Sequence, residues 1–122
     1  MNRDMDLVRK ILFKLEEKDS SNFDTVDVNG YDEDIVAGHI MLLCDAGLVA
    51  DVEETRPFGG NPIICMPDRL TWQGHEYLDA SRDEARWAKA KSVAEKSGGL
   101  TFDAFKQVLV KLMTEAAMSQ IR

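Results

Sequence analysis

Apolar residues recur at helical spacing near the start of the chain, which predicts a helix over about residues 4–18. The residues of this apolar stripe are Met5, Val8, Ile11, Leu12 and Leu15. Apolar and polar residues then alternate from Phe23 to Val28, and a period of two is typical of a short strand. Asn29 and Gly30 predict a turn after this strand.

A second amphipathic pattern predicts a helix over about residues 32–46. Its buried positions are Val36, Ile40 and Leu43. Gly47 follows and can take the left-handed conformation that ends a helix. Residues 48–55 and 63–70 are predicted to be two strands around a loop rich in Gly and Pro. A helix followed directly by a hairpin is the arrangement of a winged-helix domain, where this helix takes the place of the DNA-reading helix.

The last part of the chain is predicted to be helical. Thr71 can cap a single long helix that runs to about residue 96, and Thr101 can cap a final helix after the Gly98-Gly99 break. The final helix has an apolar seam at alternating three- and four-residue steps, which is typical of a helix that packs along a partner helix. We expect a homodimer through this seam and the tryptophan of the long helix, that is, through Trp87, Phe105, Leu109, Leu112 and Ala116.

Together these elements predict a mainly α protein with a small β-hairpin, an α+β fold. We expect a winged-helix core over residues 1–71, followed by a C-terminal helical hairpin over residues 72–122. The hairpin would pack on the core or on a second subunit, and the chain would be a single domain overall.

Three segments are similar, in this order, to an uncharacterised family of small bacterial and prophage-borne winged-helix proteins. They are Arg3–Leu12, Gly30–Val49 and Arg69–Asp79, and the last, with the letters Leu-Thr-Trp-Gln-Gly-His-Glu-Tyr-Leu-Asp, is the most specific. The resemblance covers about residues 3–91 and implies the winged-helix fold. The setting in mobile elements implies regulation or phage–host interaction. The family has no established activity, so the resemblance implies no site residues.

Composition is that of an ordinary globular protein: 44% of the 122 residues are hydrophobic and 30% are charged. The longest uninterrupted apolar run is Ile40–Cys44, which is far too short to span a bilayer. Acidic residues near the N-terminus do not fit a signal peptide, and two cysteines, Cys44 and Cys65, suit a reducing compartment. These features predict a cytoplasmic protein that does not bind membranes.

Charge changes the picture that the fold suggests. The net charge is −7, yet residues 19–55 contain ten acidic residues and no Lys or Arg, so this stretch carries −10 and the remainder +3. The outward stripe of the second helix is predicted to be Asp34, Gly38, Met41 and Asp45, with Ala37 alongside. DNA reading requires Arg, Lys, Asn or Gln at such positions, and phosphate contacts require positive charge. We therefore expect this face to dock on a basic protein, to mimic the charge of a nucleic acid, or to serve as a solvated acidic surface.

Binding of DNA through another surface is the alternative. The first helix offers basic residues at Arg9, Lys10, Lys14 and Lys18, and the long helix offers Arg82, Arg86 and Lys89. A transcription regulator that uses either surface would fit the winged-helix prediction.

No catalytic, cofactor-binding or metal-binding motif is recognisable. His75 and Asp79 fall on one helical face, but no third ligand is evident, so His75 is predicted to be hydrogen-bonded near Trp72 instead. His39 is predicted to be a packed, hydrogen-bonded side chain, and Trp72 and Trp87 to hold the long helix to its own domain. There is no Gly-rich phosphate loop and no nucleophile elbow. The sequence predicts a non-catalytic protein without a cofactor or a small-molecule substrate.

Overall fold

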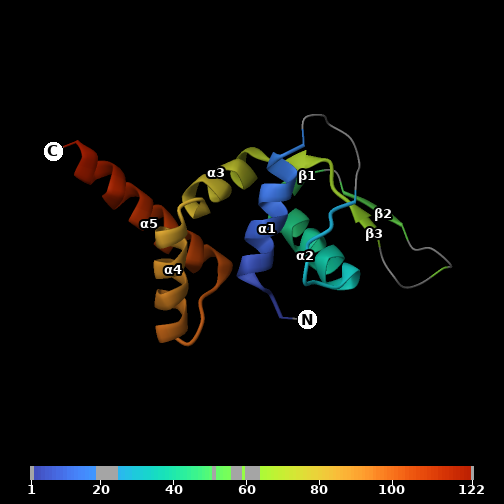
Figure 1. The fold of residues 1–122 in the computed structure, drawn as a ribbon, viewed down its shortest axis with the longest axis horizontal. Coiled ribbons are helices and arrows are strands. Elements are labelled where there is room, and N and C mark those ends of the chain that lie inside the picture. Colours follow the sequence, from blue (N-terminus) through green and yellow to red (C-terminus); the bar gives the residue numbers. More distant parts are fainter. Residues whose placement is uncertain (1, 19–24, 51, 56–58, 60–63, 122) are drawn as a thin grey trace. The chain divides into compact units, whose positions relative to one another are not determined.

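A computed structural model describes residues 2–18, 25–50, 52–55, 59 and 64–121, which form two compact units, Met1–His75 and Glu76–Arg122. The fold is mainly helical with a small antiparallel β component (Figure 1). The elements in chain order are α1 (Met5–Glu16), α2 (Glu33–Asp45), β1 (Val49–Ala50), β2 (Glu53–Thr55), β3 (Ile64–Met66), β4 (Arg69–Leu70), α3 (Trp72–Ser81), α4 (Glu84–Lys96) and α5 (Phe102–Gln120). In the described part of the chain, no helix is both long and apolar enough to cross a bilayer.

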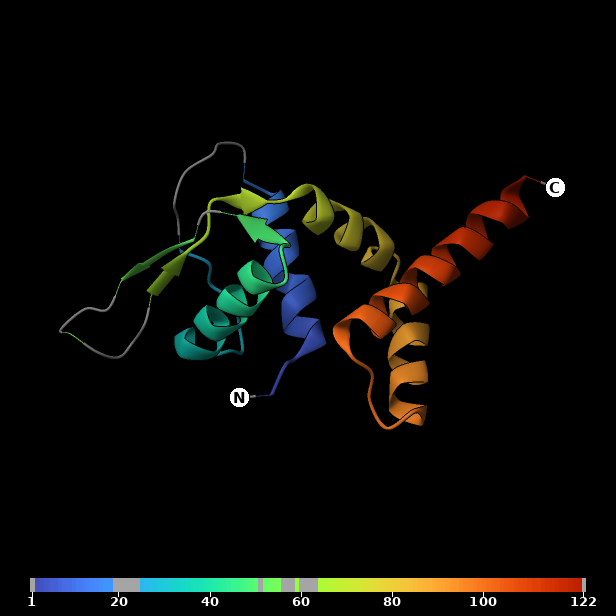
Figure 2. The same ribbon diagram turned by 180° about the vertical axis from the view of Figure 1, so that it is seen from behind.

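The core of the first unit lies between α1 and α2, which lie side by side in both ribbon views (Figures 1 and 2). Both helices have the bounds expected from their apolar stripes to within a few residues. The predicted stripe of α1 is buried except at Met5, which is half-buried, and Leu7 joins the core instead. The core residues from the two helices are Leu7, Val8, Ile11, Leu12, Leu15, Val36, Ala37, Ile40 and Leu43.

The predicted hairpin is confirmed in its pairing. β1 pairs with β4, β2 pairs with β3, and both pairs are antiparallel. The two ladders keep one register, from Val49 opposite Leu70 to Thr55 opposite Ile64, so they belong to one hairpin whose pairing is interrupted between them. Leu48, Val49 and Leu70 are buried at the base of this hairpin.

The strand predicted over residues 23–28 is wrong for the residues that the structure describes. Thr25–Val28 belong to neither helix nor strand, while residues 23 and 24 lie outside the described residues. Val28 is buried and Asp27 exposed, so part of the predicted alternation is present. A strand also needs a paired neighbour, and the described strands pair only within the hairpin.

The single long helix predicted from residue 71 to residue 96 is also wrong, because the chain breaks at Arg82 and Asp83 into α3 and α4. Asp83 has an extended backbone and its Oδ1 accepts a hydrogen bond from the Arg86 backbone N–H at 2.8 Å, as an N-cap does. The Arg86 side chain reaches back, and its Nε donates to the Ala80 carbonyl at 2.8 Å. The Asp83 side chain therefore caps the start of α4, and the Arg86 side chain binds a carbonyl at the end of α3.

The second unit has its own small core, formed where α4 packs against α5. Trp87 and Phe105 meet edge to face with ring centroids 5.2 Å apart, and Tyr77 stacks on Phe102 at 5.0 Å. Thr101 caps α5 as predicted, since its hydroxyl accepts from the Ala104 N–H at 3.2 Å. Gly98 and Gly99, both at positive φ, end α4.

Candidate interaction surface

The outward face of α2 carries the acidic residues that the sequence places there. Asp34 and Asp45 are exposed, and Gly38 and Met41 are half-buried. Ala37, expected beside this face, is buried with 5% of its surface exposed. It lies three residues before Ile40 and so shares the core side of the helix. We call the four residues Asp34, Gly38, Met41 and Asp45 the α2 face.

A polar cluster fixes the N-terminal half of α2 against α1. The carboxylate of Asp4 caps α1 by accepting from the Leu7 N–H at 3.1 Å, and it also accepts from the Tyr31 hydroxyl at 3.1 Å. The Asp4 N–H donates to Nε2 of His39 at 2.9 Å, and His39 Nδ1 lies 2.8 Å from the Ile35 carbonyl. His39 is fully buried, which confirms its predicted structural role. The two ring nitrogens of His39 thus join the start of α1 to the first turn of α2.

A second cluster fixes the C-terminal end of α2. Gly47, at φ +79°, lets the Leu48 N–H turn back to the Leu43 carbonyl at 2.9 Å. The Thr71 hydroxyl donates to the Gly47 carbonyl and accepts from the Gly74 N–H at 3.0 Å, while the Thr71 N–H donates to the Leu48 carbonyl. The end of α2 and the start of α3 are therefore joined directly, and the α2 face is held on a rigid element.

α2 carries acidic residues at both of its ends, although negative charge stabilises only the N-terminal end of a helix. Glu33 and Asp34 lie in the first turn, where negative charge is favourable beside the helix N-terminus. Asp45 is the last helical residue, and the last turn contains no basic residue. Negative charge at a helix C-terminus is unfavourable, so Asp45 costs stability where it stands. The exposed carboxylates of Asp27, Asp32 and Glu53 add to the same charge.

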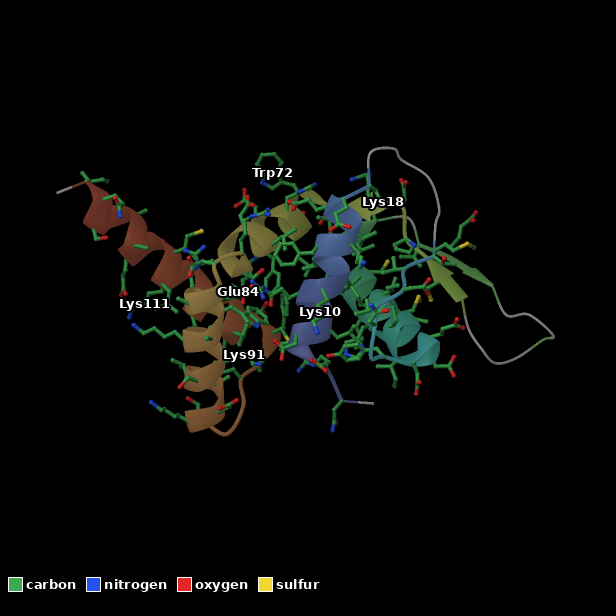
Figure 3. The ribbon with its side chains drawn as sticks, viewed as in Figure 1. Lys10, Lys18, Trp72, Glu84, Lys91 and Lys111 are labelled. Carbon is green, nitrogen blue, oxygen red and sulfur yellow. The ribbon has the colours of Figure 1, made fainter. Side chains whose placement is uncertain are left out.

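The basic stripe on α1 is partly used within the molecule. The Lys18 ammonium donates to the carbonyls of Pro67 and Asp68 at 3.0 and 2.7 Å, so Lys18 is a structural link instead of the phosphate contact considered above. Arg9 lies over the Phe13 ring at 5.2 Å and Lys10 over the Tyr31 ring at 5.5 Å. Lys10 and Lys14 remain exposed, and Figure 3 shows Lys10 on α1.

The second set of basic residues, Arg82, Arg86 and Lys89, is also partly engaged within the chain. Arg86 holds the end of α3 through the Ala80 carbonyl and through the Asp79 carbonyl at 3.3 Å. Arg82 forms an ion pair with Asp79 at 2.9 Å. Arg82 and Arg86 are therefore engaged within the chain, whereas Lys89 is exposed on α4.

Only part of the predicted dimer seam is accessible, because the second unit buries the rest of it in its own core. Trp87, Phe105 and Leu109 are buried within the chain, with 4%, 3% and 0% exposed. Leu112 is half-buried and Ala116 is exposed. The distal part of α5, from Val110 to the C-cap Ile121, also exposes three large apolar side chains, Val110, Met118 and Ile121. The proximal half of α5 therefore belongs to the intramolecular core.

Two expectations about α3 are corrected by its exposure. Trp72 does not hold the helix to its domain: 76% of its surface is exposed, and its ring projects away from α3 (Figure 3). His75, expected to be held near Trp72, is exposed as well. Within the described residues no group of three His, Cys, Asp or Glu side chains could hold a metal ion. Cys44 and Cys65 are free thiols, half-buried and buried respectively.

Sequence reasoning missed the hydrogen bonds that join distant segments. Asp4 and Tyr31 each lie beside a recognisable helix start, but nothing in their spacing relates either to His39. A signal was present in Thr71 and Gly74, since a Thr three residues before a Gly fits a helix cap followed by a close backbone approach. A Cβ at Gly74 would overlap the Leu48 carbonyl oxygen.

These features define the class: a small α+β protein with two compact units and an acidic helix face fixed at both ends. The chain belongs to the family described as "Hypothetical protein (DUF2513)", whose model matches residues 2–101. It is 34% identical over 118 residues to an uncharacterised protein of Haemophilus influenzae, an alignment that covers 94% of this chain and 98% of that protein. No solved structure matches it.

Proposed function

We propose that this protein is a non-catalytic bacterial regulatory or interaction protein that docks on a basic surface of another protein through the α2 face. One observation carries the proposal: Asp45 keeps an exposed carboxylate at a helix C-terminus, where it opposes helix stability. A solvated acidic surface would be served as well by positions that stabilise the helix. The absence of Lys and Arg from residues 19–55 of the sequence leaves this charge available to a partner.

We further propose that the first unit is a variant of the winged-helix fold, acting in the cytoplasm and in a prophage or other mobile-element setting. The order of α1, α2 and a hairpin supports the fold. The connection departs from a helix-turn-helix, because residues 17–32 separate α1 from α2 in place of a turn of about 3–4 residues. This departure fits a scaffold whose α2 meets a protein more readily than a DNA groove.

The test is affinity purification of the tagged protein from the bacterium that encodes it, followed by mass spectrometry. The Asp34→Asn/Asp45→Asn variant should lose a specific protein that the wild type retains. Glu95→Gln/Asp103→Asn, which removes the same charge from exposed positions on α4 and α5, is the matched control and should retain it. Equal recovery with both variants would refute the α2 face as the docking surface.

Binding of DNA remains the second candidate, and exposed Lys10 and Lys14 on α1 favour it. A gel-shift series at low salt separates the two, because phosphate contacts weaken steeply as salt increases. Tight, sequence-dependent binding that is lost in Arg9→Gln/Lys10→Gln would replace the protein-docking proposal.

We also propose a homodimer through the distal part of α5. Leu112, Ala116, Val110, Met118 and Ile121 leave apolar surface there that the intramolecular core does not cover. Burial of such surface is the usual driving force for association.

A further inference from the structure

A pocket of about 180 Å³ opens beside the N-terminal half of α2, within the first unit. It is bounded by residues 25–27, by α2 and by Cys65 of β3. Its apolar lining includes Val36 and Ile40 of α2, and both residues are almost completely buried. Asp27 and Glu33 line it as well, and both are exposed.

The volume limits what the pocket can hold. Sites for drug-sized ligands and cofactors occupy about 300–1,000 Å³. This pocket is smaller, so it suits a single side chain presented by a larger partner. An extended chain of methylene groups in the pocket would contact Val36 and Ile40.

The charge limits the occupant further. Two carboxylates, Asp27 and Glu33, line the pocket, and Asp32 and Asp34 flank Glu33 on exposed positions. No Lys or Arg occurs in the sequence from residue 19 to residue 55, and none is among the described residues that line the pocket. A lining that combines apolar side chains with two carboxylates is complementary to a side chain with an aliphatic stem and a cationic head.

Arginine matches this chemistry better than lysine. A guanidinium is more weakly hydrated than an ammonium, so it loses less on entering a partly apolar site. Its planar fork can also pair with a carboxylate through two parallel hydrogen bonds.

We propose that this pocket binds one arginine side chain of a basic partner segment, with the stem against Val36 and Ile40 and the guanidinium between Asp27 and Glu33. The inference rests on the proposed function, because it names the chemistry of the partner that the acidic surface recruits. The pocket supplies the specific contact, and the α2 face supplies general attraction.

The test is an NMR titration of the full chain with N-acetyl-arginine methylamide, observing the methyl groups of Val36 and Ile40. We expect saturable shifts of these methyl groups with a dissociation constant in the millimolar range. The citrulline, norleucine and lysine analogues should bind more weakly. Citrulline keeps the shape of arginine without its charge, and norleucine keeps only the stem. Equal or tighter binding of any of the three would overturn the proposal, as would no binding of the arginine compound.

Variants locate the binding and separate it from the proposed function. Asp27→Asn/Glu33→Gln should weaken the arginine compound about fivefold or more, while Asp34→Asn/Asp45→Asn, with the same change of charge outside the pocket, should not. Equal weakening by both variants would mean general attraction and would overturn the pocket.

A labelled hexalysine peptide tests the α2 face independently through fluorescence anisotropy. Hexalysine binding that depends on Asp34 and Asp45, without arginine binding in the pocket, would leave the proposed function standing and refute the pocket. Arginine binding in the pocket, together with hexalysine binding that does not depend on Asp34 and Asp45, would support the pocket and refute the α2 face as the docking surface.

Discussion

Single residues in this protein act mainly by joining segments that are distant in sequence. Gly74 lies in the first turn of α3, where the helix passes against the Leu48 carbonyl. Asp4 binds α1, Tyr31 and His39 through its carboxylate and its N–H. These residues fall within segments that resemble the family. Their contacts give each a structural role, so conservation there would report on the fold before it reports on function.

Gly74→Ala should destabilise the first unit by about 1–3 kcal/mol, because the added Cβ overlaps backbone and cannot move aside without displacing α3 or the end of α2. The gain in helix propensity, about 1 kcal/mol, offsets only part of this cost. Urea unfolding measures the change. Gln73→Ala, at an exposed neighbouring position, is the control, and equal stability of the two variants would contradict the close approach.

Asp45→Asn should stabilise the folded protein by about 0.3–1 kcal/mol, because it removes a negative charge from the C-terminus of α2. Asp34→Asn should do the opposite by a similar amount, because Asp34 lies in the first turn. Thermal unfolding at low ionic strength is the measurement, since salt screens both effects. A loss of stability in Asp45→Asn would show that this carboxylate has a favourable intramolecular role.

At the scale of whole elements, the sequence predicts those whose apolar pattern is complete within one segment. α1, α2, the hairpin and α5 were predictable because their stripes, caps and turn residues are local. The break between α3 and α4 was not, because Asp83 and Arg86 are also compatible with an uninterrupted helix as an ion pair at three-residue spacing. The extended backbone of Asp83, seen only in the structure, shows that Asp83 caps a new helix instead.

The candidate site was predictable in composition but not in shape. The charge of the α2 face follows from the sequence alone, and so does the exposure of Asp34 and Asp45. The pocket beside it depends on how residues 25–27 pass α2 and β3, which no local pattern encodes. The structural use of Lys18 is missed for the same reason, since its acceptors lie 49 and 50 residues away.

Asp83→Ala should cost about 1 kcal/mol of stability through loss of the α4 cap, and Asp83→Ser should recover most of it. Both substitutions remove the negative charge, so the difference between them isolates the hydrogen bond to the Arg86 N–H. Chemical unfolding followed by circular dichroism gives the two values. If Ala and Ser are equivalent, the cap contributes nothing and the break has another cause.

At the scale of the molecule, the two units differ in charge. Residues 1–75 contain 15 acidic and 7 basic residues, a net charge of −8, whereas residues 76–122 contain 7 acidic and 8 basic residues, a net charge of +1. The first unit therefore carries nearly all of the negative field that would attract a basic partner. The second unit carries the exposed apolar surface of α5. The proposed recruitment of a partner and the proposed self-association would thus use different units.

Met118→Glu/Ile121→Glu should convert a dimer into a monomer at micromolar concentration, because both side chains are exposed apolar residues of distal α5. Light scattering coupled to size exclusion measures the mass. Leu109 is unsuitable for this test, since it is fully buried in the chain and its substitution would unfold the second unit. A wild type that is monomeric in this range removes the basis of the dimer, and Gln107→Glu controls for added charge.

The shared hydroxyl of Thr71 has a consequence for the time course of local opening. The amides of Leu48, Thr71 and Gly74 take part in one chain of hydrogen bonds that joins the end of α2, the base of the hairpin and the start of α3. None of these bonds can open widely while the others stay formed, so the three amides should exchange their hydrogens with solvent deuterium at a common free energy. The hairpin and both adjoining helix ends would then form one cooperative opening unit, although they are assigned to four separate elements.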